Sequence, residues 1–457
     1  MSEVLDRTRP PKPGKLPEVS FPPFIERTLS NGLKVYIVEN HEQPIVSVSM
    51  YVLGGSSQDP AERQGLASIT GEMLTKGTAR RTALQIADEI DFVGGSLNSG
   101  SSWDANTVSV TVLTKFLPVG LDLLSDVILN PTFPQEELDR VKLQRLASIK
   151  QAKADAGYLA DTAFSKLVFG DHAYGQQAGG TEQSVEALSV EDVKRFHSSQ
   201  FGVNNAFVIA AGDVNVDAFL STLNDLFGNW GQASVSQRSM PELPQIAASR
   251  VALVSKPAAV QSAIRIGHLG IERNHPDFIT LYVMNMLLGG YFNSRINLNL
   301  REKNGYTYGA RSFFDARVQQ GPFAVSTEVS TAVTAAAVRE IISELTLLTV
   351  DGITDEELSM VKNYVIGSFP LQIETPQQVA SRVAMIVLYG LDKNYYDSFR
   401  DKVAHLTRDD IKLAAKKYLH PSKLLIVASG DVDSLHNAMT EIAPLEIYDQ
   451  DGNRIAR

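Results

Sequence analysis

Two side chains in the second half of the sequence carry hydrogen-bond donors that can stabilise a developing negative charge. The segment LREKNGYTYG (300–309) places Arg301 and Tyr308 seven residues apart, with Tyr306 between them. A guanidinium is always protonated, and together with a phenol hydroxyl it can donate to the oxyanion that forms when a carbonyl group is attacked. On residue type alone, the simpler interpretation is a structural ion pair for Arg301 and a packed strand position for Tyr308.

A second segment, RQGLASITGEMLTKGT (63–78), has the pattern of a helix but lacks metal ligands. Its only acidic residue is Glu72, which has no evident partner for catalysis in the sequence. Catalytic zinc needs neutral imidazoles one helical turn apart, a carboxylate and an open position for water. The chain has no cysteine, and no two histidines are four residues apart, so we expect no zinc site and ordinary surface or hydrogen-bonded roles for the histidines at 41, 172, 197, 268, 275, 405, 420 and 436.

The segment LLGGYF (287–292) places Gly289 and Gly290 after an apolar helical pattern. Glycines at such a position permit a positive φ or a close approach of the backbone. Two interpretations remain open: a loop that faces bound substrate, or a helix C-cap. A phosphate-binding loop is excluded because no Gly-Lys-Ser/Thr follows.

Composition narrows the class of protein. The 457 residues correspond to roughly two to four domains, and 44% hydrophobic content is enough to bury full cores. A net charge of −10 without a dense Lys/Arg run argues against nucleic-acid binding. No apolar run approaches the ~20 residues of a membrane span, and residues 1–23 hold six prolines but no apolar stretch of the signal-peptide type.

The sequence is an internal repeat. Three pairs of segments match in the same order, two of them 218 residues apart and the third 220 residues apart. The pairs are LSVEDVK (188–194) with LTRDDIK (406–412), FVIAAGDVN (207–215) with LIVASGDVD (425–433), and FPQEELDRVK (133–142) with ITDEELSMVK (353–362).

We therefore predict two homologous α+β domains of about 220 residues, each a mainly antiparallel sheet with helices packed on one face. The Asn-Gly pair in RTLSNGLKVYIVEN (27–40) predicts an opening hairpin, and PIVSVSMYVLGG (44–55) predicts a third strand. The predicted layout is an N-terminal arm at 1–23, a first domain at 24–232, a linker at 233–249, a second domain at 250–445 and a C-terminal tail at 446–457.

Several stretches resemble the M16 (insulinase or pitrilysin-like) peptidase family, M16B branch. LSNGLKVYIVEN (29–40) resembles the opening hairpin of that family, and GLASITGEMLTKGT (65–78) lies where members carry a His-x-x-Glu-His helix. LLGGYFNSRINLNLREKNGYTYGA (287–310) resembles the second-domain signature. The resemblance covers about residues 25–440 and implies the two-domain M16/LuxS-like metallohydrolase fold.

The resemblance also implies that the zinc site of this chain is degenerate. It places the first histidine on Ser68, the base glutamate on Gly71 and the second histidine on Glu72. The distal carboxylate would fall near Ala147 or Ser148. All of these positions depart from the family pattern, so the resemblance implies no cofactor in this chain and no peptide cleavage by this chain alone.

The second-domain signature, by contrast, is present. The resemblance assigns to Arg301 and Tyr308 the role of holding the substrate at the scissile bond, with Tyr306 the less favoured tyrosine. It places Gly289 and Gly290 beside the substrate. Arg301 and Tyr308 would then complete the catalytic site of a partner chain.

The function implied is that of a non-catalytic subunit in a heteromeric M16 zinc peptidase. A second M16-type chain with His-x-x-Glu-His would supply the zinc, and this chain would supply Arg301, Tyr308 and half of a chamber for unfolded peptides, which bind as an added strand. The alternative is a structural or peptide-binding protein on the same fold with no role in proteolysis. A metal-independent enzyme has no supporting nucleophile and base. The resemblance slightly favours the periplasm or cell envelope, whereas a genuine start at Met1 would indicate the cytoplasm.

Overall fold

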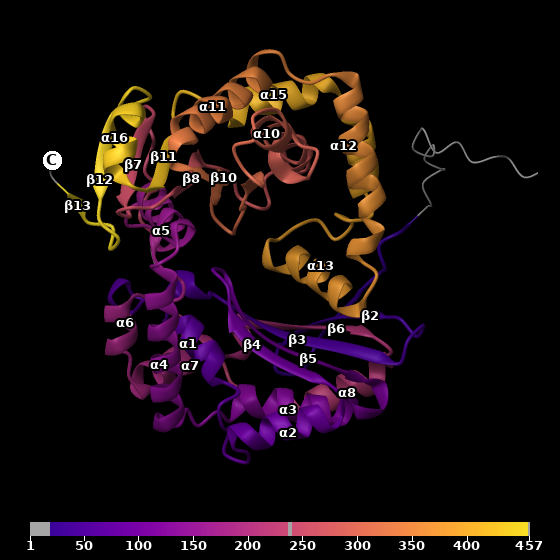
Figure 1. Ribbon diagram of the computed structural model, residues 1–457. Helices are drawn as coiled ribbons and strands as arrows, with labels where there is room; N and C mark the ends of the chain where they lie inside the picture. The colour runs from indigo at the N-terminus through magenta and orange to yellow at the C-terminus, as the bar shows by residue number, and fades with distance from the viewer. Residues whose placement is uncertain (1–18, 236–239, 456–457) are drawn as a thin grey trace, which may run out of the picture.

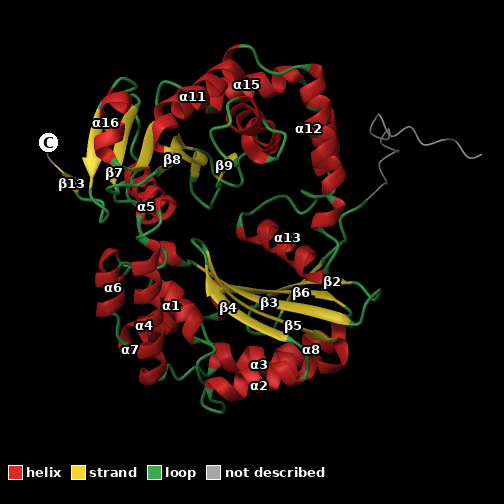
Figure 2. Cartoon of the chain, viewed as in Figure 1, coloured by secondary structure: helices red, strands yellow, loops and turns green. Residues whose placement is uncertain are grey.

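The chain folds around two mixed sheets, one in each half of the sequence (Figures 1 and 2). The structure is a computed structural model that describes residues 19–235 and 240–455. The first sheet has six strands in the order β1-β2-β6-β3-β5-β4, and the second has seven in the order β13-β12-β7-β11-β8-β10-β9. Four of the five pairings in the first sheet and four of the six in the second are antiparallel, as predicted.

The strands of the first sheet are β1 (Ile25–Thr28), β2 (Lys34–Glu39), β3 (Ile45–Leu53), β4 (Ser96–Ser101), β5 (Ala105–Leu113) and β6 (Ala206–Gly212). Those of the second are β7 (Arg250–Ser255), β8 (Gln261–Leu269), β9 (Ala310–Phe314), β10 (Pro322–Ser330), β11 (Leu425–Gly430), β12 (Leu445–Tyr448) and β13 (Arg454–Ile455).

The helices of the first half are α1 (Leu66–Met73), α2 (Ala83–Phe92), α3 (Leu117–Leu129), α4 (Gln135–Ala152), α5 (Ala156–Phe169), α6 (Glu182–Ala187), α7 (Val190–Gln200) and α8 (Val216–Phe227). Those of the second are α9 (Phe278–Asn285), α10 (Arg295–Asn297), α11 (Thr334–Val350), α12 (Asp355–Ser368), α13 (Pro376–Leu388), α14 (Phe399–His405), α15 (Arg408–Tyr418) and α16 (Val432–Thr440). Two π-helical segments, Met286–Gly290 and Leu298–Lys303, continue α9 and α10.

The predicted opening hairpin and third strand are confirmed. Thr28 pairs with Lys34 at the end of β1, and the backbone N–H of Leu29 donates to the carbonyl of Leu33 across the turn. Gly32 has a φ of 95°, a conformation that glycine adopts without steric cost. The turn residues therefore set the register of β1 on β2.

The internal repeat is visible in equivalent elements. Helices α7 and α15 both begin with a capping box. The side chains of Ser189 and Thr407 accept hydrogen bonds from the backbone N–H groups of Asp192 and Asp410, whose carboxylates accept from the backbone N–H groups of Ser189 and Thr407 in return. Each helix precedes the central strand of its sheet, β6 or β11. The predicted fold class, two homologous α+β domains, is therefore the observed one.

One helix from each half packs against the sheet of the other half. Helix α5 packs against β8 and β11, and α13 packs against β3 and β6, opposite α3 and α8 (Figure 1). Side chains along β2 alternate accordingly: Val35 and Ile37 face the core of the first half, whereas Tyr36 and Val38 join the core that contains α13. Helices thus cover both faces of the central strands, whereas the sequence indicated one covered face.

A loop of the second half also docks into the first half. In the β9–β10 connection, the guanidinium carbon of Arg317 lies 4.6 Å from the ring centres of both Trp103 and Tyr174. The backbone N–H of Val318 donates to Oδ2 of Asp104 at 3.1 Å, and the hydroxyl of Tyr174 donates to Oδ1 at 2.5 Å. Burial nevertheless raises the pKa of Asp104. This buried contact fixes the two halves relative to each other.

The ends of the chain differ in part from the predicted layout. Most of the predicted N-terminal arm lies outside the described residues, as do residues 236–239 of the predicted linker. The predicted tail at 446–457 instead contributes to the second sheet, because β12 runs parallel to β7 and pairs with β13. Within the described ranges, no helix is both long and apolar enough to cross a bilayer.

Candidate functional site

Helix α1, which carries Ser68, Gly71 and Glu72, is held at its N-terminus by a buried carboxylate. Asp59 is 1% exposed and accepts hydrogen bonds from the backbone N–H groups of Gly65 and Ala67, each at 2.8 Å. A carboxylate at this end satisfies two N–H groups of the first turn and complements the helix dipole. The start of α1 is therefore fixed.

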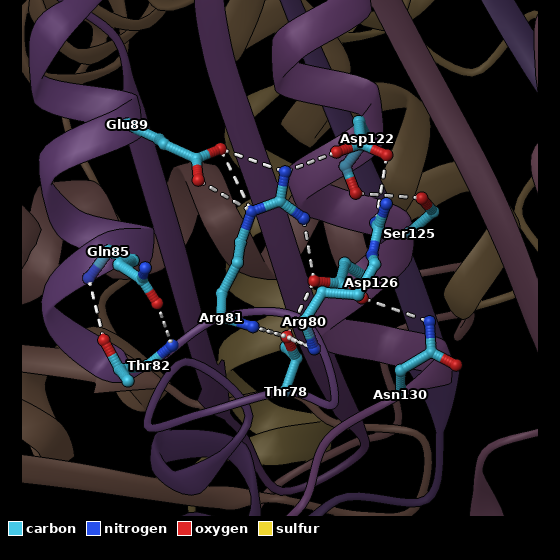
Figure 3. A network of polar contacts seen from close by, with 10 residues as sticks. All are labelled: Thr78, Arg80, Arg81, Thr82, Gln85, Glu89, Asp122, Ser125, Asp126 and Asn130. Carbon is cyan, nitrogen blue, oxygen red and sulfur yellow. Dashed lines mark hydrogen bonds and ion pairs between the residues drawn. The ribbon is translucent and has the colours of Figure 1, made fainter.

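A polar network anchors the chain beyond α1 (Figure 3). The side chain of Asp126 in α3 is fully buried and accepts from Thr78 Oγ1 at 2.7 Å, Arg81 Nη1 at 2.8 Å and Arg80 Nε at 3.0 Å. Burial acts to raise the pKa of Asp126, but these bonds, with one from Asn130, outweigh it and hold the pKa below its usual value. The network therefore ties the segment that follows α1 to α3.

A guanidinium lies at the degenerate zinc positions. Arg145 of α4 donates from Nη1 to Ser68 Oγ at 3.1 Å and from Nη2 to Glu72 Oε2 at 3.1 Å. Nη1 also donates to the carbonyl of Gly179 at 3.2 Å. Ser68 and Glu72 are one helical turn apart, so the guanidinium bridges the two positions that the family resemblance assigns to imidazoles.

The sequence did not predict the contacts of Arg145 with Ser68 and Glu72. The sequence showed no partner for Glu72 in catalysis, and in the structure Glu72 forms an ion pair with Arg145. The residue that reaches α1 from α4 is neither Ala147 nor Ser148, whose hydroxyl donates to the carbonyl of Gln144 in its own helix. Arg145 lies three residues before Ser148 and hence on the same face of the helix.

Gly71 makes the closest approach between α1 and the edge strand β4. A Cβ atom at this position would lie 3.0 Å from the carbonyl carbon of Gly100 and 3.1 Å from its Cα. Both neighbours are backbone atoms, which cannot rotate away. Any side chain at position 71 would therefore force β4 or α1 to move.

These residues do not fit a catalytic zinc ion. A guanidinium, a hydroxyl and one carboxylate replace the neutral imidazoles that zinc prefers, and Arg145 would repel a divalent cation. Among residues 19–235 and 240–455, no group of three or more His, Cys, Asp or Glu side chains could hold a metal ion. The pair His268 and His420, with ring centres 4.9 Å apart, is already satisfied, because His268 Nδ1 donates to the carbonyl of Leu269 and Nε2 accepts from the His420 backbone.

The predicted residues of the second half gather around one cavity. A cavity of about 590 Å³ is lined by Gly289, Gly290, Arg301 and Tyr308. Strands β8, β9 and β10 contribute part of the wall, with Gln261, Arg311 and Glu328 among the lining residues. The fold thus brings together four of the five residues proposed from the sequence.

The two donor side chains make few competing contacts. Tyr308 is 94% exposed. The guanidinium carbon of Arg301 lies 4.6 Å from the ring centre of Phe292, and its Nε lies 3.4 Å from the exposed carboxylate of Glu302. Tyr306, in contrast, packs its ring against the core of the second half and does not line the cavity.

The two glycines end a helix and also line the cavity, so the two interpretations of LLGGYF are not exclusive. They form the last turn of the π-helical segment, and Tyr291 follows as its C-cap. A Cβ at Gly289 would lie 2.5 Å from the backbone nitrogen of Ser312, and neither glycine has a positive φ. Gly289 therefore permits a close approach of the helix to β9, which positions the cavity wall.

Comparison with known proteins agrees with this architecture. The family model described as Insulinase (Peptidase family M16) matches residues 34–181, and the model described as Peptidase M16 inactive domain matches residues 187–365. A relative named as an uncharacterized zinc protease of Streptomyces coelicolor is 25% identical over 90% of this chain and 92% of the relative. A relative from Helicobacter pylori, named non-peptidase homolog YmxG, is 26% identical over 83% of this chain and 88% of the relative.

Solved structures share the whole fold. The peptidase M16 inactive domain from Pseudomonas fluorescens superposes with a TM-score of 0.84 at 25% identity, over 89% of this chain and 98% of that one. A protease from Helicobacter pylori gives a TM-score of 0.83 at 20% identity, over 89% and 99% of the two chains. The two family models adjoin along the sequence and together cover more than two thirds of it, so both halves of the chain are similar to domains of the M16 peptidase family.

Proposed function

We propose that this chain is a non-catalytic subunit of a heteromeric M16 peptidase. The observation that carries the proposal is the contrast between its two sites. At α1 a guanidinium stands in the place of a metal, whereas in the second half Arg301 and Tyr308 line an open cavity with their donor groups available. A protein with only the second site has donors for an oxyanion but nothing that generates a nucleophile.

The missing part would come from a second M16-type chain that carries His-x-x-Glu-His and the zinc. This chain would place Arg301 and Tyr308 against the peptide carbonyl that the partner attacks. Its edge strand β4, next to α1, would offer backbone groups to an extended, unfolded peptide. The substrates are accordingly unfolded peptides, and the complex is a heterodimer that encloses them.

Helix α5 supports a single substrate path between the two sites. Asp161 of α5 lines a cavity of about 320 Å³ next to Arg145 and pairs with Arg265 of β8, with Oδ1 2.5 Å from Nε. Gly157 of the same helix approaches Glu328, which lines the cavity of Arg301. Gly157 and Asp161 are one helical turn apart, so α5 adjoins both cavities, as a peptide that contacts both halves would require.

The test begins with the native complex. Peptide cleavage is measured for the chain purified with the proteins that accompany it, with and without a chelator, and for the recombinant chain alone. We expect chelator-sensitive cleavage only in the native sample. Cleavage by the recombinant chain would contradict the reading of Ser68, Gly71 and Glu72, and no cleavage in either sample would favour the alternative below.

Two tyrosine variants then test the assigned role within the reconstituted complex. Tyr308→Phe removes only the donor hydroxyl, and the loss of one oxyanion donor typically lowers kcat about 10²–10³-fold. Tyr306→Phe is the matched control, because Tyr306 packs against the core and does not line the cavity. Equal activities for the two variants would exclude Tyr308 from the reaction.

The alternative is a structural or peptide-binding protein on the M16 fold. It is favoured by the name of the Helicobacter pylori relative, non-peptidase homolog, and by the salt-bridged state of α1. Under this alternative the native sample binds unfolded peptide but does not cleave it.

A further inference from the structure

Arg273, at the start of the segment leading to α9, is a buried cation that forms no ion pair with a carboxylate of residues 19–235 or 240–455. The residue is only 8% exposed, and no Asp or Glu oxygen in the described part of the chain forms an ion pair with it. Its side chain donates one hydrogen bond there, from Nη1 to the hydroxyl of Tyr395 at 3.3 Å. A buried guanidinium normally has an anionic partner, since leaving it unpaired is costly.

The guanidinium of Arg273 lies over two aromatic rings. Its Cζ lies 3.8 Å from the ring centre of Phe278 and 5.0 Å from that of Tyr395. The backbone N–H of Arg273 also donates to the carbonyl of Arg317, in the loop that joins the two halves. Stacking on ring faces offsets part of the burial cost and leaves the edge of the guanidinium, where the N–H groups lie, available for an acceptor.

Arg273 lines a cavity. It has a volume of about 520 Å³, within the range of small-molecule sites. Lys402 of α14 lines it, as do His275 and His405, so that several nitrogen-bearing side chains converge from separate elements. Phe278, Ile279, Leu391 and Leu406 supply an apolar wall.

Two carboxylates also line the cavity, and each accepts hydrogen bonds from a residue two or three positions away in the sequence. Asp410 Oδ2 accepts from the N–H and the hydroxyl of Thr407, at 2.8 and 2.6 Å, as the cap of α15. Asp392 Oδ1 accepts from the N–H of Asn394 at 2.8 Å. Neither makes an ion pair with Arg273 or Lys402, so the cavity keeps a cationic end in a chain of net charge −10.

We propose that this cavity, the Arg273 pocket, binds a small organic anion. Its carboxylate or phosphate group would pair with Arg273 and Lys402, and its apolar part would lie along Phe278 and Leu391. A planar guanidinium suits either group because its fork of N–H donors matches two oxygen atoms at once. The pocket shares no lining residue with the cavity of Arg301 and Tyr308, so the inference is independent of the proposed function.

Calorimetric titration of the full chain tests the proposal. Three probes are compared: inorganic phosphate, N-acetylphenylalanine, and N-acetylphenylalanine amide, which has the same apolar group without the anion. We expect saturable binding of phosphate or of N-acetylphenylalanine and none of the amide. The responding probe identifies whether phosphate or carboxylate is the recognised group.

Charge-reversal variants place the binding in the pocket. Lys402→Glu should weaken binding at least about tenfold, whereas Lys416→Glu, an exposed lysine on α15 that does not line the cavity, should leave it unchanged. Both lysines are exposed, so neither substitution should unfold the chain, which circular dichroism verifies. The proposal is overturned if neither anion binds by about 10 mM, if the amide binds as well as the acid, or if Lys402→Glu and Lys416→Glu behave alike.

Discussion

Nη2 of Arg145 donates a hydrogen bond to Oε2 of Glu72 at 3.1 Å, although the two residues are 73 positions apart in the sequence. The same guanidinium reaches Ser68, one helical turn before Glu72. In a catalytic zinc site, a metal between two such positions lowers the pKa of a bound water. A guanidinium keeps its proton at any ordinary pH and holds no water for ionisation, so it can replace the metal as a cation but not as a catalyst.

The first prediction concerns the stability that Arg145 contributes. Arg145→Met keeps most of the side-chain volume but removes the donors to Ser68, Glu72 and Gly179, and should lower the free energy of unfolding by about 1–2 kcal/mol. In a double-mutant cycle with Glu72→Gln, the double variant should lose about 0.5–1 kcal/mol less unfolding free energy than the sum of the losses of the two single variants. Urea denaturation of the four proteins measures both quantities.

A matched control lies on the same helix. Arg140 is about half exposed and forms an i,i+3 surface pair with Glu137, so Arg140→Met should cost less than about 0.5 kcal/mol. Equal costs for Arg140→Met and Arg145→Met would show that the contact with α1 contributes nothing beyond an ordinary surface pair.

The second prediction is that the positive charge of Arg145 prevents tight zinc binding at positions 68 and 72. Restoring ligands by Ser68→His, Glu72→His and Ser148→Glu should give a chain that binds zinc weakly as long as Arg145 remains. Adding Arg145→Ala should raise the affinity for zinc at least about tenfold, because a fixed positive charge then no longer opposes the ion. Titration against a chromogenic chelator measures zinc binding without any activity assay. Equal affinities in the two backgrounds would contradict the idea that the guanidinium occupies the place of the metal.

The fold was predictable where local signals and the repeat agree. One pair of repeat segments, LSVEDVK and LTRDDIK, contains the two capping boxes at the starts of α7 and α15. A capping box is a local signal, since Ser189 and Thr407 need only a partner three residues later. The Asn-Gly turn of the first hairpin is local in the same sense.

Features that depend on distant packing were not predictable. The periodicity of α5 and α13 shows an apolar face but not that this face lies on the sheet of the other half. Arg145 was likewise invisible as a partner of Glu72, because only the placement of α4 beside α1 brings them together. The one available signal was its spacing of three residues from Ser148, where the family resemblance directed attention.

The third prediction tests the close approach of α1 to β4. Gly71→Ala should destabilise the chain by about 1–3 kcal/mol, because the new methyl group meets the backbone of Gly100. The reciprocal change, Gly100→Ala, is the control, since a Cβ there has no neighbour within 4 Å. Thermal unfolding of the two variants should show a lower midpoint for Gly71→Ala only. A midpoint for Gly71→Ala at or above that of the unmodified chain would mean that the helix propensity gained by alanine exceeds the steric cost.

The fourth prediction concerns acid and rests on the buried carboxylate of Asp126. The pKa of Asp126 in the folded chain is lowered below its usual value of about 3.9, so the folded state favours the ionised form. The resulting stabilisation is fully present above the pKa of the unfolded chain and is lost as the pH falls through the lower pKa of the folded chain. At neutral pH, Asp126→Asn should therefore cost about 2–4 kcal/mol, since it leaves Arg80 and Arg81 without their buried partner.

The difference between the two proteins should shrink as the pH falls below about 4, because protonation removes the same charge from the unmodified chain. Urea denaturation at pH 7 and at pH 3 measures the change, with Asp88→Asn on the exposed face of α2 as a control that should have little effect at either pH. A cost for Asp126→Asn that is the same at both pH values would show that the network stabilises the loop after α1 through hydrogen-bond geometry alone. The carboxylate charge would then not be what holds residues 78–81 against α3.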